Sequence, residues 1–229
     1  LIFLLIMIRR IVRRYRDWEL AKAERHKVLK QGTLLNAFYR SRTIFIHIPK
    51  TAGVSLVKAI YGDVTLSGHR SVYFHSIVLK PDKTKYFSFS FVRNPYDRLY
   101  SAYVFLSEGG INSHDKLAFA TYLSRFKDFE DFVLNGLDKE MIFKITHFIP
   151  QYEYLCDKNG NVLVDFLGRF ESLYDDVNHL SIKLGKNIKL CHYNRTEKRK
   201  YTNSYTQEMI DKVHRIYEKD IAIFEYSFE

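Results

Sequence analysis

Two short runs of aromatic and β-branched residues, each followed at once by a turn and a helical pattern, constrain the fold of this chain most strongly. The first run is Thr43 to Ile48, which Pro49 ends, and helical periodicity follows at Gly53 to Tyr61. The second run is Tyr86 to Val92. Strands that alternate with helices are typical of parallel βαβ units, whose ligand loops lie at the carboxyl ends of the strands. The sequence therefore predicts an α/β fold with a central, mainly parallel sheet flanked by helices.

The second run leads into a clearly marked helix start. Asn94 is a favourable N-cap residue, and Pro95 suits the first helical turn. The helix that follows carries an apolar stripe at helical spacing, which we expect to face the core. The stripe consists of Tyr96, Leu99, Tyr100 and Tyr103.

Further elements are expected in the C-terminal half of the chain. A short helix at Asp128 to Asn135 precedes two strand-like arms, Tyr152 to Cys156 and Val162 to Phe166, which flank a turn-forming stretch typical of a hairpin. Helices are expected at about 171–184 and 206–219 from their apolar spacing.

Length limits the chain to one folded domain. With 229 residues, 46% of them hydrophobic, it can bury one sizeable core but is too short for two ordinary enzyme domains and a linker. We place this domain at residues 32–229 and treat residues 1–31 as an N-terminal segment. A basic helix over about 9–31 is expected to lie on a membrane surface or to pack its apolar stripe on the domain. That stripe consists of Ile11, Tyr15, Trp18, Ala21 and Val28.

The composition of the N-terminal residues predicts on which side of a membrane the domain lies. Leu1 to Ile8 are all apolar, but a membrane-spanning helix needs roughly 20 such residues. A cluster of arginines follows, and the positive-inside rule would hold the domain on the cytoplasmic side of a membrane. If the apolar stretch is the end of a longer anchor, a Golgi membrane is the alternative. The arginines are Arg9, Arg10, Arg13, Arg14 and Arg16.

Charge and cysteine content narrow the functional classes. Lys and Arg exceed Asp and Glu by 36 to 26, a net charge of +10, so the surface should attract anions such as nucleotide phosphates, nucleic acid, anionic lipid or acidic glycans. The aromatic residues fall mainly in strand-like runs and helix stripes, which disfavours a nucleic-acid-binding protein. Cys156 and Cys191 are too distant in sequence to form a disulfide framework, which favours a reducing compartment.

The loop after the first run has the composition of an anion site. Residues 48–55 lie between a strand and a helix, where free backbone N–H groups and the positive helix end attract a phosphate or sulfate. Lys50 adds a full charge, and Gly53 allows a close approach of the backbone. Thr51 and Ser55 add hydroxyl donors. The Walker A pattern is absent and no acidic residue is obviously placed for magnesium, which disfavours the rival nucleotide kinase or phosphoryl transferase.

The second loop offers a guanidinium and a hydroxyl. Arg93 lies at the strand end, and Ser101 lies two turns into the helix, away from the apolar stripe. Together they could hold a second phosphate, because the guanidinium fork matches phosphate oxygens. The alternative for Arg93 is an ion pair with Asp97. Two phosphate sites on adjacent strands are the informative feature.

These loops resemble a known family. Residues 46–53 and 90–103 are similar to the two motifs that bind 3′-phosphoadenosine 5′-phosphosulfate (PAPS) in Golgi-type carbohydrate sulfotransferases and their bacterial relatives, and the similarity extends over roughly 43–226. The resemblance implies a P-loop-like sulfotransferase fold without a metal, with sulfuryl transfer from PAPS to a carbohydrate hydroxyl. Further similar segments are Phe148 to Tyr152, Gly168 to Glu171 and the spacing of Tyr217, Asp220, Phe224 and Tyr226.

The resemblance also implies roles for single residues. Arg93 and Ser101 would bind the 3′-phosphate. Val54 stands where the family loop usually has Thr, so a side-chain hydroxyl is lost, at a cost of about 1.5–3 kcal/mol if it is irreplaceable. A family member that binds the nucleotide without catalysis is therefore an alternative. The 5′-phosphosulfate would be bound by Lys50, Thr51, Ala52, Gly53, Val54 and Ser55.

The expected reaction needs a cation at the leaving group and a base at the acceptor. Lys50 would neutralise charge on the departing bisphosphate. Of nine histidines, His69 matches the position where several polysaccharide sulfotransferases of this family carry a catalytic histidine. His75 is the reserve, and Glu108 is a third choice.

The remaining candidates are expected to be structural or surface residues. His47, inside a strand, is predicted to be a core histidine, and His147 and His192 are interpreted as structural. Arg169 and the basic stretch Asn194 to Lys200 fit a solvated surface better than contacts to nucleotide or acceptor. Residues 104–147 are expected to shape the acceptor site, without indicating which carbohydrate they bind.

Overall fold

The computed structural model describes residues 2–79, 86–190 and 200–229. Its helices and strands run in the order α1 (Ile2–Glu24), η1 (Arg25–Val28), α2 (Leu34–Ser41), β1 (Thr43–Ile46), α3 (Gly53–Tyr61), α4 (Val72–Val78), β2 (Phe87–Val92), α5 (Pro95–Ser107), α6 (Ser113–Ala118), η3 (Phe119–Leu123), α7 (Phe129–Asp131), η4 (Phe132–Gly136), α8 (Met141–Lys144), η5 (Thr146–Phe148), α9 (Tyr152–Leu155), β3 (Phe166–Arg169), α10 (Leu173–Leu184), η6 (Tyr201–Ser204) and α11 (Gln207–Phe224).

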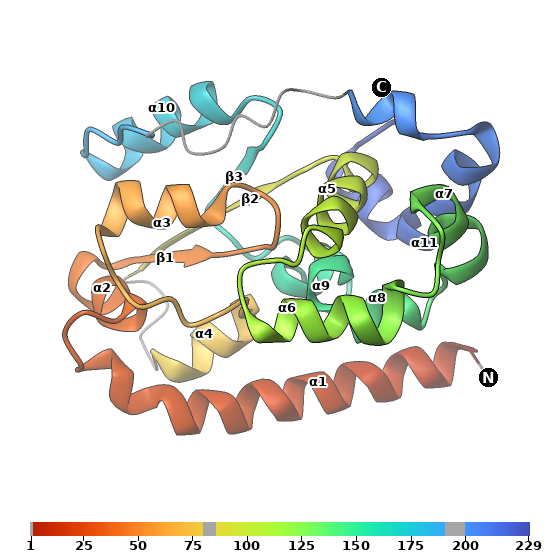
Figure 1. Ribbon diagram of the computed structural model, residues 1–229. Coiled ribbons are helices and arrows are strands. Elements are labelled where there is room, and N and C mark those ends of the chain that lie inside the picture. Colours follow the sequence, from red (N-terminus) through yellow and green to blue (C-terminus); the bar gives the residue numbers. More distant parts are fainter. Residues whose placement is uncertain (1, 80–85, 191–199) are drawn as a thin grey trace.

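A parallel sheet with the strand order β1-β2-β3 lies at the centre of the fold. Helices α3 and α10 cover one face and α4 and α1 lie below the other, as Figure 1 shows. The predicted α/β class is confirmed, and so are the first two strands and the helix after each. Val162 to Phe166 was predicted as a hairpin arm, but the strand begins only at Phe166 and pairs in parallel with β2, where Gly168 lies opposite Phe91.

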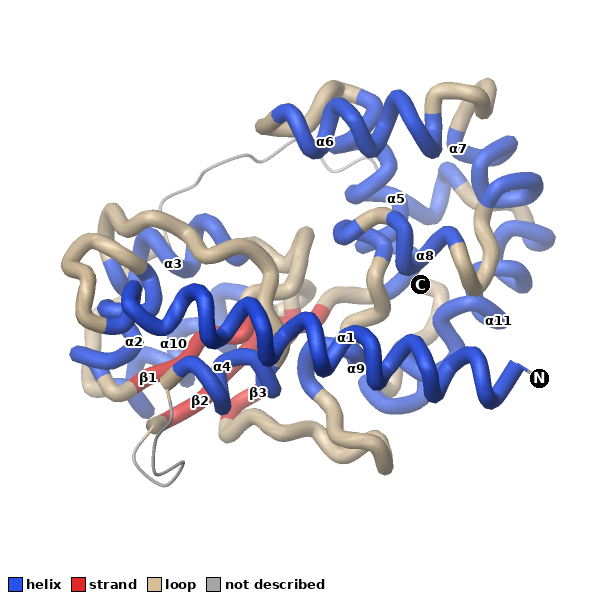
Figure 2. The backbone as a smooth tube through the Cα atoms, turned by 90° about the horizontal axis from the view of Figure 1, so that it is seen from below, coloured by secondary structure: helices blue, strands red, loops and turns tan. Residues whose placement is uncertain are grey.

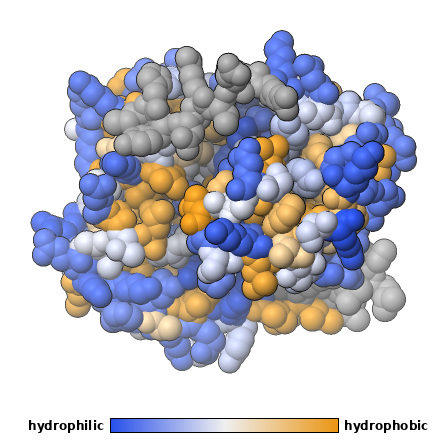
Figure 3. All heavy atoms as spheres, viewed as in Figure 1, coloured by the Kyte–Doolittle hydropathy of each residue, from blue (hydrophilic) through white to orange (hydrophobic). Residues whose placement is uncertain are grey.

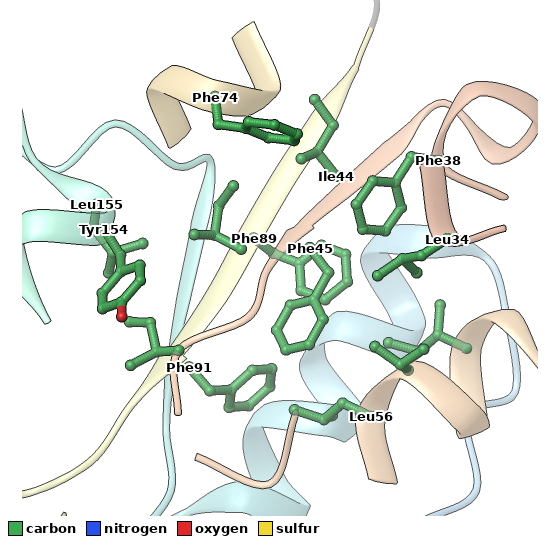
Figure 4. Packing of buried hydrophobic residues seen from close by; sticks show 14 of the residues in the cluster. Leu34, Phe38, Ile44, Phe45, Leu56, Phe74, Phe89, Phe91, Tyr154 and Leu155 are labelled. Atoms are coloured by element: carbon green, nitrogen blue, oxygen red, sulfur yellow. The ribbon is translucent and has the colours of Figure 1, made fainter. Parts of the chain in front are cut away.

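Aromatic side chains fill the core on both faces of the sheet (Figure 4). The rings of Phe45 and Phe89 stack at 5.1 Å on neighbouring strands. Gly168 has a packing role, since a Cβ there would lie 2.4 Å from the ring of Phe91. A larger residue in β3 would therefore displace a side chain that is fully buried.

The predicted hairpin is wrong in its first arm. Tyr152–Leu155 forms the short helix α9, because the carboxylate of Asp220 accepts hydrogen bonds from the backbone N–H groups of Gln151 and Tyr152 at 2.7 and 2.8 Å. Such a carboxylate satisfies the free donors at a helix N-terminus. A single antiparallel bridge between Cys156 and Val162 remains of the expected pairing.

A second, mainly helical core packs beside the sheet around α5 and α11. The predicted stripe of α5 is confirmed: Tyr96, Leu99 and Tyr103 are buried and Tyr100 is half-buried. Asn94 caps α5 as expected, since its side chain accepts a hydrogen bond from the N–H of Tyr96 at 3.1 Å.

Helix α1 packs against α4 and continues beneath the helical part of the molecule (Figure 2). Its inward face carries carboxylates: Asp17 and Glu24 are buried, and Glu24 pairs with Arg70 at 2.6 Å. Ile11 and Tyr15 are 59% and 63% exposed, so for these two residues the alternative that the stripe packs on the domain is wrong. Long-range pairing with Arg70 and with the hydroxyl of Ser71 outweighs the apolar pattern on this helix.

The N-terminal half of α1 is partly apolar at the surface. Figure 3 shows hydrophobic residues along the lower edge of the molecule, where this half of α1 lies. Ile8, Ile11 and Val12 are exposed, and Ile8 and Val12 line a groove with Ile142 and Ile149. Among the described residues, none of the helices has both the length and the apolar character needed to cross a bilayer. The membrane-surface interpretation and the domain boundary near residue 31 stay predictions.

Candidate functional site

The loop after β1 has a strained backbone. Lys50 and Ala52 adopt left-handed conformations, with φ of +69° and +61°, although neither is glycine. Each such residue costs about 1–3 kcal/mol, and strain of this kind concentrates at ligand sites. The hydroxyl of Thr51 donates a hydrogen bond to the carbonyl of Ile48 at 3.0 Å. The proton of Thr51 therefore stabilises the loop itself instead of serving a ligand.

The loop leads into the open N-terminus of α3. The N-cap residue is Ala52, whose methyl group makes no cap, and the first intrahelical hydrogen bond runs from the N–H of Leu56 to the carbonyl of Ala52. The N–H groups of Gly53, Val54 and Ser55 have no acceptor within the helix, which suits them to an anion. Val54 is 55% exposed, so its apolar side chain lies at the surface beside these donors.

Gly53 makes room for a histidine. A Cβ at Gly53 would lie 1.8 Å from the ring of His47, which is buried and stacks on Phe45 at 5.8 Å. The sequence predicts that Gly53 allows close approach of a phosphate. The structure adds a second explanation, since a larger residue would clash with the ring of His47. Burial lowers the pKa of His47 well below its usual value, and the neighbouring imidazoles of His69 and His147 lower it further.

The structure brings the two predicted phosphate loops together. The guanidinium of Arg93 donates a hydrogen bond to the carbonyl of Lys50 at 3.0 Å, beside the turn from β1 into α3 that faces α5 in Figure 1. The predicted alternative is also present, because Arg93 makes two hydrogen bonds of 2.8 Å to Asp97. Ser101 is half-buried one turn after Asp97, on the same side of α5.

Three segments that resemble the family, and that are distant in sequence from the second loop, hold this loop in place. The side-chain amide of Gln151 pairs with both the N–H and the carbonyl of Arg93, at 2.9 and 2.8 Å. Glu171 accepts a hydrogen bond from the N–H of Asn94 at 2.6 Å and another from the hydroxyl of Tyr226 at 2.9 Å. The segments that extend the family resemblance therefore support the loop, and the Phe170 ring of one of them lies 4.1 Å from the guanidinium of Arg93.

Lys50 lies in an electrostatic environment that makes its charge easy to lose. Burial and, to a smaller extent, the neighbouring Arg93 lower the pKa of Lys50 to about 8, although the charges of Glu108 and Asp115 act to raise it. Its Nζ atom lies 4.0 Å from the ring centroid of Phe105, a cation–π contact. An anion bound beside Lys50 would offset this lost stabilisation and keep the amine charged.

His69 lies next to this loop in a form suited to accept a proton. Its Nδ1 atom lies 3.1 Å from the carbonyl of His47, and because a carbonyl only accepts, Nδ1 is the protonated nitrogen. Nε2 then carries the lone pair. Burial lowers the pKa of His69, which keeps the ring neutral near pH 7. The ring lies 4.4 Å from that of His47.

Of the other predicted candidates, Glu108 acts on Lys50 through its charge, whereas His75 and Arg169 lie in structural positions. His75 is buried in the core, 5.5 Å from the ring of Phe38, and burial lowers its pKa to about 3. Arg169 is a structural residue rather than a solvated one, since its guanidinium donates to the carbonyl of Phe224 at 2.7 Å. Glu108 is exposed. His192 and residues 194–199 of the basic stretch lie outside the described residues.

Sequence reasoning missed two residues of this site. His147, interpreted as structural, lies 5.9 Å from the ring of His69, and its Nδ1 atom lies 3.9 Å from a carboxylate oxygen of Asp115. The position of His147 next to a similar segment, Phe148 to Tyr152, was the one available indication. No such indication existed for Asp115, because a position in a short polar helix favours exposure. In the part of the chain that the structure describes, no cluster of three or more His, Cys, Asp or Glu is arranged to hold a metal ion.

Comparison with known proteins agrees with these features. Residues 39–227 match the model of the Sulfotransferase family. Carbohydrate sulfotransferase 14 from Mus musculus is 27% identical over 189 aligned residues, which cover 71% of this chain and 49% of the relative. The Homo sapiens protein gives the same values. The chain spans about half the length of the curated relatives it matches, and no solved structure gives a significant match. Because the family match extends over most of its length, the chain belongs to the Sulfotransferase family.

Proposed function

We propose that this protein transfers a sulfuryl group from PAPS to a hydroxyl group of a carbohydrate. The observation that carries the proposal is the hydrogen bond between Arg93 and the carbonyl of Lys50, which joins the two anion-binding loops into one site. Loops far apart would need two ligands, whereas adjacent loops can hold both ends of one doubly phosphorylated nucleotide.

The residues present fit PAPS at both ends. The left-handed backbone at Lys50 and Ala52 and the open N-terminus of α3 form a concave set of N–H donors for the 5′-phosphosulfate. Arg93 and Ser101 would take the 3′-phosphate. For this, Arg93 must share its guanidinium between the phosphate and Asp97, which holds the fork in place.

PAPS supplies the sulfuryl group, and the protein supplies position and charge. Lys50 would hold negative charge on the bisphosphate as it leaves, an interaction that grows toward the transition state. His69 would accept the proton of the attacking hydroxyl at Nε2, because its Nδ1–H is engaged with the carbonyl of His47.

A carbohydrate acceptor is supported by the relatives, whose names describe carbohydrate sulfotransferases. Residues 104–147 would form much of the acceptor side. They include Phe105 and His147, which lie next to Lys50 and His69 respectively. The acceptor hydroxyl would then approach from the side of α5 and α6.

Thermal shift measurements test the donor. Adenosine 3′,5′-bisphosphate should raise the melting temperature more than AMP or ATP at equal concentration, since a ligand stabilises the fold according to its affinity. Lys50→Ala should remove most of this shift. The matched control is Lys58→Ala, which removes an exposed lysine from the same α3 region. A larger response to magnesium and ATP would support the kinase alternative and overturn the donor assignment.

Sulfate transfer from labelled PAPS to a panel of desulfated polysaccharides (heparosan, chondroitin and dermatan) tests the reaction. His69→Ala should lower turnover on the order of 10²–10⁴-fold while leaving bisphosphate binding intact, because a general base contributes that much. If a folded His69→Ala protein turns over near the wild-type rate, His69 is not the base. Binding of the bisphosphate without transfer to any panel member would support the non-catalytic alternative.

A further inference from the structure

The site contains a histidine and a carboxylate that the reaction as described does not use. His147 follows α8 in the short helix η5, and its ring lies 5.9 Å from that of His69 and 5.1 Å from that of Phe105. The same Phe105 ring contacts the amine of Lys50. His147 therefore lies between the proposed base and the proposed leaving-group residue, and Asp115 approaches it from α6.

Asp115 is an unusual residue to bury. It is the buried residue of α6, 6% exposed, in a helix whose other side chains lie at or near the surface. A helix normally buries apolar residues, and a buried carboxylate costs free energy unless it is paired. One oxygen accepts a hydrogen bond from the N–H of Ile111 at 3.1 Å. The other faces Nδ1 of His147.

The surrounding backbone is shaped around this carboxylate. Gly110 has φ of +59°, and a Cβ at that position would lie 2.2 Å from the Cβ of Asp115. Asn112 caps α6 through its side chain, which accepts a hydrogen bond from the N–H of Asp115 at 3.0 Å. The orientation of the carboxylate toward His147 is thus determined by its own turn and helix.

His147 is held just as firmly on its own side. Arg98, which is 1% exposed, donates hydrogen bonds to the carbonyls of His147 and Ile149 at 3.0 and 2.9 Å. This buried arginine places the backbone of η5 against α5. The backbone of His147 is therefore fixed, and its imidazole lies against the rings of Phe105 and His69.

We propose that Asp115 and His147 are positioning residues for His69, which orient its ring and balance the positive charge that it gains from the acceptor. The inference rests on the proposed function. In that step the acceptor oxygen bonds to sulfur as the bond from sulfur to the bisphosphate breaks, and the acceptor proton passes to Nε2 of His69. The negative charge of Asp115 acts across the His147 ring and stabilises the protonated form of His69.

The charges around the two histidines give the direction of the effect. Burial is the main cause that lowers the pKa of both His69 and His147, the latter to about 4. Among the described groups that shift these two pKa values, Asp115 is the carboxylate, and it raises both. Removing its charge therefore lowers the pKa of the base. The cations that act against it are Lys50, Arg70 and Arg98.

The test compares Asp115→Asn with a matched control in the full chain. Asparagine keeps the shape and can still accept from Ile111, so only the charge is lost. The control is Asp131→Asn, because Asp131 accepts the same local hydrogen bond from the residue four positions earlier, Lys127, at 2.8 Å. The melting temperature should be unchanged in both variants. Bisphosphate affinity should be compared at pH 6.5 or below, where Lys50 stays charged even without the charge of Asp115, and should there be unchanged as well.

Three results are expected with labelled PAPS and the polysaccharide that the wild-type chain sulfates. Asp115→Asn should lower kcat on the order of tenfold, as part of the contribution of a general base. Its KM for PAPS should stay within about twofold, since positioning of the base affects the chemical step rather than donor binding. The acid limb of its pH profile should move to lower pH, because the unprotonated base persists further into acid.

Several outcomes would overturn the inference. One is an Asp115→Asn protein that matches Asp131→Asn in kcat and in the position of its acid limb. Another is His147→Ala abolishing turnover while His69→Ala retains it, which would make His147 the base itself. A wild-type chain that transfers no sulfate to any polysaccharide overturns the proposed function as well, so the two failures are distinguishable.

Discussion

Gly53→Ala tests whether the anion loop is shaped by His47. The added methyl group would lie 1.8 Å from Cδ2 and 2.0 Å from Nε2 of the His47 ring. That ring is buried and has Phe45 and His69 beside it, so it has little space to move. Inserting a methyl group into packed structure costs about 1–3 kcal/mol. For a chain of this size the melting temperature should fall by roughly 2–12 °C, at about 2–4 °C per kcal/mol.

The sign of the effect should reverse when the ring is removed. Gly53 is the first residue of α3 and has no positive φ, so alanine suits its backbone there. In a His47→Ala background Gly53→Ala should be neutral or stabilising by up to about 1 kcal/mol, since alanine loses less conformational entropy than glycine. Differential scanning fluorimetry or chemical denaturation of the four proteins in this double-mutant cycle measures the coupling, which is the difference between the two effects and should be about 1–4 kcal/mol.

The same four proteins separate packing from ligand contact. If Gly53 is needed only for His47, the double variant should bind adenosine 3′,5′-bisphosphate as tightly as His47→Ala alone. If the glycine is needed for the phosphate, both Gly53→Ala proteins should bind weakly. A Gly53→Ala change that has the same effect on stability with and without the His47 ring would refute the packing argument.

Two further predictions follow from the same loops. Because the pKa of Lys50 is about 8 and the charged form binds anions, bisphosphate affinity should fall about tenfold between pH 7 and 9. Calorimetric titration measures this fall, and Lys50→Arg, whose charge persists, should not show it. Gln151→Leu leaves the buried N–H and carbonyl of Arg93 unpaired, so it should lower the free energy of unfolding by about 1–3 kcal/mol. The exposed Gln207→Leu, which loses a hydrogen bond to Asp211, serves as the control, and equal melting temperatures for the two variants would contradict the assigned role of Gln151.

Local patterns predicted the part of the fold that carries the anion loops. The first two strands, the helix at Gly53–Tyr61 and the Asn94 cap depend on neighbouring residues, and all appear where expected. The third strand does not appear where expected. Its four residues, Phe166–Arg169, include Gly168, which is a weak strand former but is needed there because the Phe91 ring of another strand leaves no space for a Cβ. A single sequence does not display such a long-range packing requirement.

The residues of the candidate site also divide into those that local sequence predicts and those that it does not. Lys50 and Arg93 could be chosen from their own loops, and the structure brings them together. His147 and Asp115 could not, since they reach the site only through contacts distant in sequence, such as the hydrogen bond from Arg98 to the carbonyl of His147. Their types also misled the interpretation, because a lone histidine in an apolar segment and an aspartate in a polar helix are most often structural or exposed.

The segments outside the two loops that resemble the family have a structural role in holding one of the loops. Gln151 and Glu171 come from segments 20 residues apart, yet both bind the backbone of the same dipeptide, Arg93–Asn94. Asp220 in turn accepts from the N–H of Gln151 and so places that amide. A turn that must present a guanidinium at one position needs its backbone N–H and carbonyl groups satisfied by hydrogen bonds from outside the turn. These segments therefore hold one peptide in place, and their resemblance to the family is explained by a scaffold that positions Arg93.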